Sequence, residues 1–266
     1  MAVEQSGVEA TADADALAPP SLSLIIPAYN EAARITETLA EAVAYLAAQP
    51  YRGELILVDD GSTDGTADVA RRCLSDQPDV HLLAIPHAGK AVAIRTGMRA
   101  ARYDQIAFSD ADLATPLSYL AELRAAVAGG CDVAIGSREG VGARRLGEPL
   151  YRHVMGRVFN LLVRVLVLPG IQDTQCGFKL FTRDAALALL DRARLYASSA
   201  EVTGARVTAF DVELLVIARR QGLRICPIPV VWTYGTQTKV NPVRDTWQNV
   251  RDVFTVRWND WRGGYR

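Results

Sequence analysis

Short apolar runs alternate with segments of helical length through the first half of the sequence. The apolar runs are Leu22–Ile26, Leu55–Val58, Val80–Ala84, Ile106–Phe108 and Val133–Ile135, and the segments between them cover roughly residues 31–48, 64–76, 89–103 and 116–128. This alternation predicts an α/β fold with a mostly parallel sheet and helices on both faces. Such sheets bind ligands beyond the carboxyl ends of their strands, so polar residues there are candidates for function.

The second half of the chain is less regular. Helices are predicted at 149–166, 183–190 and 211–220, and strands at Phe178–Phe181 and Arg224–Trp232. Pro227 and Pro229 within the last of these favour an edge strand or an irregular one, because proline cannot donate a ladder hydrogen bond. We expect residues 21–240 to form one domain whose later part is less regular.

The two ends of the chain have their own composition. Residues 1–20 are rich in alanine and acids and end in two prolines, which predicts a disordered leader. Over 241–266 we expect an amphipathic helix, whose apolar residues recur every three or four positions: Val243, Trp247, Val250, Phe254, Trp258 and Trp261. Its aromatic face and arginines suit a membrane interface, and packing on the domain or on a second subunit is the alternative.

Composition narrows the class of protein. The 266 residues carry 29 basic and 30 acidic side chains, a balance that argues against nucleic-acid binding. The four cysteines lie far apart, which favours a reduced compartment over a disulfide framework. No apolar run reaches membrane-spanning length, and no secretory signal is recognisable. We therefore expect a cytoplasmic protein, at most peripheral at the cytoplasmic face of a membrane.

Acidic residues follow two of the predicted strands. Asp59-Asp60 come directly after the second apolar run, and Asp110-Ala111-Asp112 come after the fourth. Adjacent carboxylates at the end of a buried strand call for a compensating cation or hydrogen-bond donor. Asp110 and Asp112 are spaced to reach one divalent ion, and Mg²⁺ or Mn²⁺ binds through one or two carboxylates plus substrate phosphates. The segment after the second apolar run can alternatively serve only to cap a helix through Asp64 and to form turns at its glycines, and Asp-x-Asp alone is common by chance.

Basic residues follow other strands. Lys90 opens a predicted helix, whose free N–H groups and lysine charge together make an anion site. Arg138 follows the fifth strand and Arg152 lies further on, and arginine is a natural phosphate clamp. Each of the three is also compatible with an ordinary solvated charge. The sequence has neither a P-loop nor a GxGxxG motif after the first strand, which argues against an NTPase or a dinucleotide dehydrogenase.

Several motifs occur in an order that resembles a known family. PAYNE, VDDGSTDGT, GK followed by AIRTGMRAA, DAD and GSR are similar to motifs of the family 2 glycosyltransferases, which have the GT-A fold and transfer sugar from a nucleotide sugar with inversion. IQDTQCGFKLF and AFDVELL resemble the dolichyl-phosphate β-glucosyltransferases, and polyprenyl-phosphate mannosyltransferases share most of the scaffold. The resemblance covers about residues 21–240.

The resemblance implies a role for each matching residue. Those implied to contact the donor are Pro27, Ala28, Tyr29, Glu31, Asp60, Lys90, Asp110, Ala111, Asp112 and Lys239. Among them, Asp60 would hydrogen-bond the base, and Asp110 and Asp112 would bind the Mg²⁺ or Mn²⁺ that bridges the diphosphate. Those implied to act in catalysis are Asp112, Arg138 and Arg152, the arginines by gripping phosphate. Mannosyltransferase relatives have a metal-binding Gln where this chain has Ala114.

These roles together describe a metal-dependent, inverting hexosyltransferase. We expect it to transfer glucose from UDP-glucose to a polyprenyl (dolichyl-type) phosphate, giving polyprenyl-phosphate β-glucose. An alcohol acceptor needs a general base, for which Asp211 is the candidate unless it is structural, whereas a phosphate acceptor is already anionic. Two alternatives are enzymes: a GDP-mannose-dependent polyprenyl-phosphate mannosyltransferase, and a family 2 enzyme with a soluble acceptor. A third is a nucleotide-sugar binder without catalytic activity that serves as a partner subunit. A second copy of the chain is a further candidate partner, in a homodimer.

Overall fold

The computed structural model describes residues 19–74, 77–196, 208–235 and 242–265, with side chains from 247 onward in the last range. Its centre is a seven-stranded sheet with the order β3-β2-β1-β4-β7-β5-β8. The strands are β1 (Leu22–Ala28), β2 (Gly53–Asp60), β3 (Val80–Ile85), β4 (Gln105–Ser109), β5 (Val133–Ser137), β7 (Phe178–Thr182) and β8 (Ile225–Pro229). β7 runs antiparallel between β4 and β5, and the other neighbouring pairs are parallel, which confirms the predicted α/β architecture.

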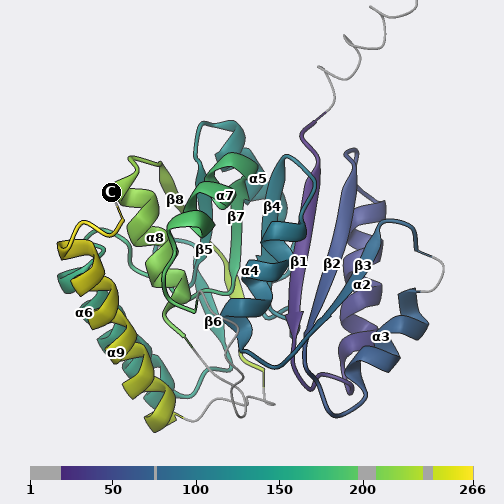
Figure 1. The fold of residues 1–266 in the computed structure, drawn as a ribbon, viewed down its shortest axis with the longest axis horizontal. Coiled ribbons are helices and arrows are strands. Elements are labelled where there is room, and N and C mark those ends of the chain that lie inside the picture. The colour runs from purple at the N-terminus through teal and green to yellow at the C-terminus, as the bar shows by residue number, and fades with distance from the viewer. Residues whose placement is uncertain (1–18, 75–76, 197–207, 236–241, 266) are drawn as a thin grey trace, which may run out of the picture.

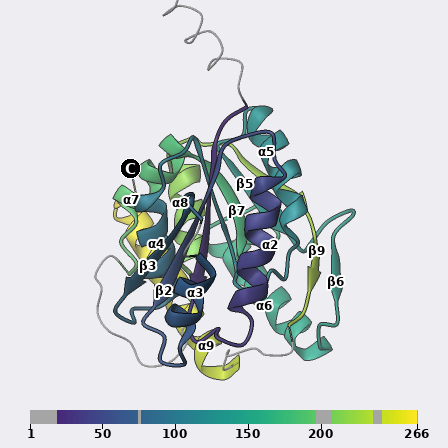
Figure 2. The same ribbon diagram turned by 90° about the vertical axis from the view of Figure 1, so that its right-hand side faces the viewer.

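Helices cover both faces of the sheet (Figures 1 and 2). One face is covered by α2 (Ile35–Ala47), α3 (Thr66–Leu74), the short 3₁₀ helix η1 (Leu117–Tyr119) and α5 (Leu120–Ala128). The other carries α4 (Lys90–Ala100), α6 (Leu150–Leu166), α7 (Arg183–Arg192), α8 (Phe210–Arg220) and α9 (Pro242–Trp261). Side chains of a strand alternate between the two faces. Leu57 of β2 accordingly packs in the core beneath α2 and α5, and Val58 packs in the core beneath α4 and α8.

The predicted strand 224–232 divides into two in the structure. Its first part, β8, is the edge strand of the main sheet, as its two prolines predict. Its last part, β9 (Val231–Thr233), leaves that sheet and pairs in parallel with β6 (Arg144–Leu146). β6 was not predicted from the sequence, because it has only three residues and lacks an apolar alternation.

The structure corrects the expectation that the cysteines are unpaired. Cys131 and Cys226 form a disulfide across a sequence separation of 95 residues. They meet because β5 and β8 are adjacent parallel strands, in which Ala134 lies opposite Cys226. Cys73 and Cys176 are free thiols, the first exposed and the second buried. Strand pairing, which sequence spacing does not reveal, is what brings the bonded pair together.

The chain ends agree in part with the sequence analysis. The predicted leader falls largely on residues 1–18, outside the described residues, as do Lys239 and the side chain of Val243. The predicted C-terminal helix is present as α9, and it packs on α6 and α8 (Figure 1). Among the described residues, no helix has the length and apolar character needed to cross a membrane. The proposed boundaries between leader, domain and helix remain predictions.

Candidate functional site

The carboxyl ends of β1, β2 and β4 place most of the predicted donor residues at one edge of the sheet. Pro27 and Ala28 end β1 and are buried, and Tyr29 follows directly. The Tyr29 ring stacks on His87, with 3.9 Å between ring centroids and 7° between planes. Glu31 forms an ion pair with Arg34 at 2.9 Å. These contacts make a small aromatic and charged platform beside the end of β2.

Asn30 fixes the loop between β1 and α2. Its φ of 55° is a left-handed conformation that asparagine tolerates better than most residues. The Asn30 N–H donates to Ser62 Oγ at 2.8 Å, and its Oδ1 accepts the Thr63 N–H at 2.8 Å. The loops after β1 and β2, far apart in sequence, are thereby joined into one rim.

The two acids that end β2 point to opposite faces and have different partners. Asp60 accepts the backbone N–H groups of Ala88 and Gly89 at 2.8 and 2.9 Å, and His87 Nδ1 lies 2.9 Å from it. Burial raises the pKa of Asp60, and those hydrogen bonds oppose the rise. Asp59 is also buried, and its Oδ1 has no hydrogen-bond partner among the described residues. Asp60 thus holds the loop that precedes α4, and its predicted contact with the base stays a prediction.

Lys90 and three carboxylates meet at the end of β4. Lys90, the first residue of α4, forms an ion pair with Asp110. Burial alone would lower the pKa of Lys90, but Asp110 and Asp211 outweigh it and raise that pKa. Burial, followed by repulsion from Asp110, raises the pKa of Asp112. The fold therefore brings together the predicted donor residues Lys90, Asp110 and Asp112 and the predicted catalytic residue Asp211.

Gly177, which precedes β7, allows Asp110 its position. A Cβ at this residue would lie 2.1 Å from Asp110 Oδ2 and 2.5 Å from its Cγ. β7 pairs with β4 so that Phe178 lies opposite Ser109, which brings Gly177 beside Asp110. A residue without a side chain is required here to leave room for the carboxylate.

Asp112 lies at the edge of a pocket of about 370 Å³. The pocket is lined by Ala33, Arg34, Glu37, Thr38, Glu41, Ala111, Asp112, Leu113 and Gly235. Leu113 has a φ of 46°, an unusual conformation for a residue with a bulky side chain, and such strain clusters at functional sites. The Ala114 N–H donates to Asp112 Oδ1 at 3.1 Å, so this position holds the carboxylate through its backbone.

The Asp110 and Asp112 pair has the chemistry of a divalent-cation site. Both supply hard oxygen ligands, which Mg²⁺ and Mn²⁺ prefer. The raised pKa of Asp112 reflects repulsion from Asp110 as well as burial, and a cation would relieve that repulsion. Within the part of the chain that the structure describes, no group of three or more His, Cys, Asp or Glu side chains could hold a metal. A cation here would take its remaining ligands from substrate phosphates and water.

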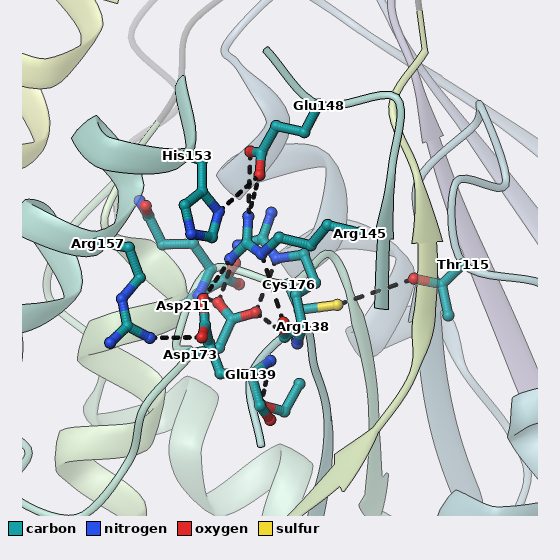
Figure 3. A network of polar contacts seen from close by, with 12 residues as sticks. Thr115, Arg138, Glu139, Arg145, Glu148, His153, Arg157, Asp173, Cys176 and Asp211 are labelled. Atoms are coloured by element: carbon teal, nitrogen blue, oxygen red, sulfur yellow. Dashed lines mark hydrogen bonds and ion pairs between the residues drawn. The ribbon is translucent and has the colours of Figure 1, made fainter. Parts of the chain in front are cut away.

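Arg138, whose side chain is 16% exposed, forms an ion pair with the buried Asp173 (Figure 3). Its Nε and Nη2 donate to the two carboxylate oxygens of Asp173 at 2.7 and 2.8 Å, and its backbone N–H donates to the same carboxylate. Asp173 is 1% exposed. The pair holds the end of β5 against the segment before β7. The phosphate contact of Arg138 stays a prediction, and the structure gives this side chain Asp173 as a structural partner.

Further ion pairs extend from Arg138 along the start of α6 (Figure 3). Arg145 contacts Glu139 at 3.0 Å and Glu148 at 2.9 Å. Arg157 of α6 pairs with Glu139 at 2.5 Å, and His153 lies 3.2 Å from Glu148. The predicted catalytic residue Arg152 donates to the Tyr234 hydroxyl at 3.0 Å and stacks on that ring. These contacts fix α6 relative to the loop that leads to it.

Sequence reasoning missed Lys179 as a site residue. This lysine of β7 is 1% exposed, donates to the Cys176 carbonyl at 2.5 Å and lies 3.3 Å from Asp211 Oδ2. A buried lysine requires such partners. Lys179, Gly177 and Asp173 all belong to DTQCGFKLF, so that motif carried the signal, whereas no sequence signal singled out His87.

Comparisons with known proteins show which family this chain is similar to. The family model of glycosyl transferase family 2 matches residues 23–190. The dolichyl-phosphate beta-glucosyltransferase ALG5C of Trichomonas vaginalis is 34% identical over 222 residues, 79% of this chain and 63% of that protein. The dolichyl-phosphate beta-glucosyltransferase of Homo sapiens is 34% identical over 261 residues, 92% of this chain and 77% of that protein. The chain thus spans less than two thirds of the length of the Trichomonas relative.

The fold is also similar to solved structures. Glucosyl-3-phosphoglycerate synthase from Mycobacterium tuberculosis, solved with Mn²⁺, UDP-glucose and phosphoglyceric acid, matches with a TM-score of 0.60 and 18% identity. The match covers 98% of this chain and 86% of that one. At this identity the likeness shows the fold, which is the predicted GT-A fold. The family model and the human relative together establish that this chain belongs to glycosyl transferase family 2.

Proposed function

We propose that this chain transfers glucose from UDP-glucose to a polyprenyl phosphate of the dolichyl type, with inversion at the anomeric carbon. The observation that carries the proposal is the meeting of Lys90, Asp110 and Asp112 at the carboxyl edge of the sheet, beside a pocket. The Trichomonas and human relatives, both named dolichyl-phosphate beta-glucosyltransferases, support the sugar and the acceptor. The UDP-glucose in the mycobacterial structure supports the donor.

Two parts of the rim suit two different parts of the nucleotide-sugar donor. The platform of Tyr29 and His87 is suited to a nucleotide base, because planar rings offer a stacking surface. Lys90, whose raised pKa keeps it protonated, is suited to the diphosphate. Asp110 and Asp112 would hold Mg²⁺ or Mn²⁺, which when bound neutralises negative charge on a departing nucleoside diphosphate. The chain itself supplies the fixed positive charge of Lys90 to that same leaving group.

The proposed acceptor needs no general base. A phosphate monoester has a second pKa of about 6, so its oxygens are anionic at neutral pH and can attack directly. Asp211 then acts as a positioning residue. Its carboxylate lies 3.3 Å from Lys179 and holds that ammonium group, and its negative charge helps to raise the pKa of Lys90. Arg152, held by Tyr234, is the candidate for contact with the acceptor phosphate.

The test is a transfer assay with glucose-labelled UDP-glucose, polyprenyl phosphate in detergent and Mn²⁺. We expect labelled lipid and UDP in equal amounts, with a β-linkage in the lipid product. Parallel reactions replace the donor by GDP-mannose or the acceptor by phosphoglyceric acid. Mannose transfer without glucose transfer would overturn the donor assignment. Glucose transfer to phosphoglyceric acid but not to the lipid would overturn the acceptor assignment.

The role of Asp211 has a separate test. Asp211→Asn should lower turnover while the dependence of rate on pH keeps its shape, because no proton passes through this carboxylate. Loss of an acidic limb from that profile would show that Asp211 accepts a proton in the reaction. Asp184→Asn, at the start of α7 and outside the site, is the matched control and should leave turnover unchanged.

A further inference from the structure

Helix α9 places its aromatic residues outward and its acids inward. Trp247, Phe254, Trp258 and Trp261 are 74, 54, 49 and 69% exposed. On the opposite side, Asp252 and Asp260 are 5 and 6% exposed. Asp252 accepts the Tyr196 hydroxyl at 2.5 Å, and Asp260 pairs with Arg220 at 2.5 Å. α9 also buries Val253 and Val256 in the core, as a surface helix of a soluble protein does, so its outward aromatic residues form a second apolar stripe that the core does not use.

Helix α6 has a similar outward apolar stripe. Its exposed apolar residues recur every three or four positions, and they are Leu150, Val154, Val158, Leu161 and Val165, each between 51 and 77% exposed. Asn160, by contrast, is 5% exposed. α6 and α9 contact each other at one side of the molecule (Figure 1). We call the outward residues of these two helices the α6–α9 surface.

The charges that accompany this surface are basic. α6 has no acidic residue in its sequence. On the described part of α9, the exposed ionisable side chains are Arg251 and Arg257, while the two acids are buried. Arg262, directly after α9, stacks on Trp258 with 4.4 Å from its Cζ to the ring centroid. Aromatic residues combined with arginines suit an interface between hydrocarbon and anionic headgroups.

We propose that the α6–α9 surface docks this chain on the surface of an anionic lipid bilayer. Apolar patches of this kind rarely remain exposed on soluble monomers. The excess of arginine favours an anionic lipid surface over a second copy of this chain, because two copies would bring like charges together. The choice of a bilayer also rests on the proposed lipid acceptor, which resides in a membrane. α6 begins beside Arg152, so the surface adjoins the acceptor side of the site.

The test is flotation of the full chain with vesicles that contain no polyprenyl phosphate. Vesicles of phosphatidylcholine alone are compared with vesicles of phosphatidylcholine mixed with phosphatidylglycerol. We expect binding to the anionic vesicles, reduced at least about tenfold by the double substitution Trp258→Ser and Trp261→Ser. The pair Val158→Ser and Leu161→Ser on α6 should also weaken binding. Val141→Ser, which changes a residue 98% exposed outside both helices, is the matched control and should bind normally.

A second pair of substitutions tests the charge. Arg251→Gln together with Arg262→Gln should weaken binding to anionic vesicles by roughly fivefold for each arginine, and should leave binding to neutral vesicles unchanged. Equal binding by wild type and the tryptophan variant would overturn the proposal. It would also be overturned if wild type ignored the vesicles and formed a dimer that the tryptophan variant dissociates.

Transfer in detergent separates this proposal from the proposed function. The tryptophan variant should transfer glucose to detergent-solubilised polyprenyl phosphate at the wild-type rate, and should lose transfer to the same lipid in vesicles. Vesicle binding without transfer in detergent would overturn the function and leave the docking surface standing. Transfer in detergent without vesicle binding would overturn the docking surface and leave the proposed function standing.

Discussion

A methyl group at Gly177 should disable the site while leaving the fold in place. In Gly177→Ala, the new Cβ would lie 2.1 Å from Asp110 Oδ2, whereas ordinary contacts begin at 3.4 Å. The Asp110 carboxylate must therefore move by more than an ångström, which would separate it from Lys90. Gly177 does not have a positive φ, so its backbone conformation suits alanine and the effect is steric.

The size of the effect follows from this displacement. A misplacement of about 1 Å in a site costs roughly 100-fold in rate. We therefore expect kcat/KM for UDP-glucose to fall about 100-fold in Gly177→Ala. Overpacking lowers the free energy of unfolding by about 1–3 kcal/mol. We expect the lower end of this range for Gly177→Ala, because Asp110 is 37% exposed and can rotate toward solvent.

Steady-state kinetics and urea unfolding measure the two quantities on the same protein. Gly156→Ala, in helix α6, is the matched control because a Cβ there meets nothing within 4 Å. This control should keep wild-type kinetics, and its free energy of unfolding should rise by about 0.5–1 kcal/mol because alanine is more stable than glycine within a helix. Wild-type kinetics in Gly177→Ala would refute the argument that this glycine exists to accommodate Asp110.

Three further predictions concern stability and charge. Asp173→Asn should reduce the free energy of unfolding by about 3–5 kcal/mol in urea at neutral pH, because it leaves Arg138 without its carboxylate. Burial raises the pKa of Asp173, but the charge and hydrogen bonds of Arg138 outweigh burial and hold that pKa below its usual 3.8. The stability from this pair is therefore present above pH 3.8 and is lost as the pH falls toward the lower pKa of the folded state. Replacing both Cys131 and Cys226 by Ser should lower that free energy by about 2–4 kcal/mol, and a reductant should reproduce the loss in wild type. Lys90→Gln should lower kcat/KM for UDP-glucose by about 100-fold, whereas unchanged kinetics would exclude a charge contact with the donor.

The sheet and its ligand edge could be predicted because buried strands carry a local signal. The apolar runs that became β1 and β2 end directly at the acids and loops of the site, and the parallel architecture brings those ends together. The family resemblance added the expected roles. The position of β7 between β4 and β5 could not be predicted, because strand order depends on contacts between distant segments. The disulfide and the Arg138–Asp173 pair depend on the same long-range order.

Periodicity predicted the apolar face of α9 without fixing where that face points. Trp258 and Trp261 fit a helical spacing whether they are buried or exposed. The structure turns them outward because Val253 and Val256 pack in the core and Asp252 and Asp260 find partners in the domain. The two acids of β2 show the same limit. Their spacing indicated a site, but only the structure shows that Asp60 is used by the loop before α4.

Calorimetric titration of UDP-glucose tests most directly whether the acidic edge binds a nucleotide sugar with a cation. Wild type is titrated with and without Mn²⁺, and Asp112→Asn is titrated under the same conditions after its fold is verified by circular dichroism. Binding should be tightened by Mn²⁺ in wild type, and that gain should disappear in Asp112→Asn. No uptake of UDP-glucose by wild type, or an equal gain from Mn²⁺ in both proteins, would contradict the account.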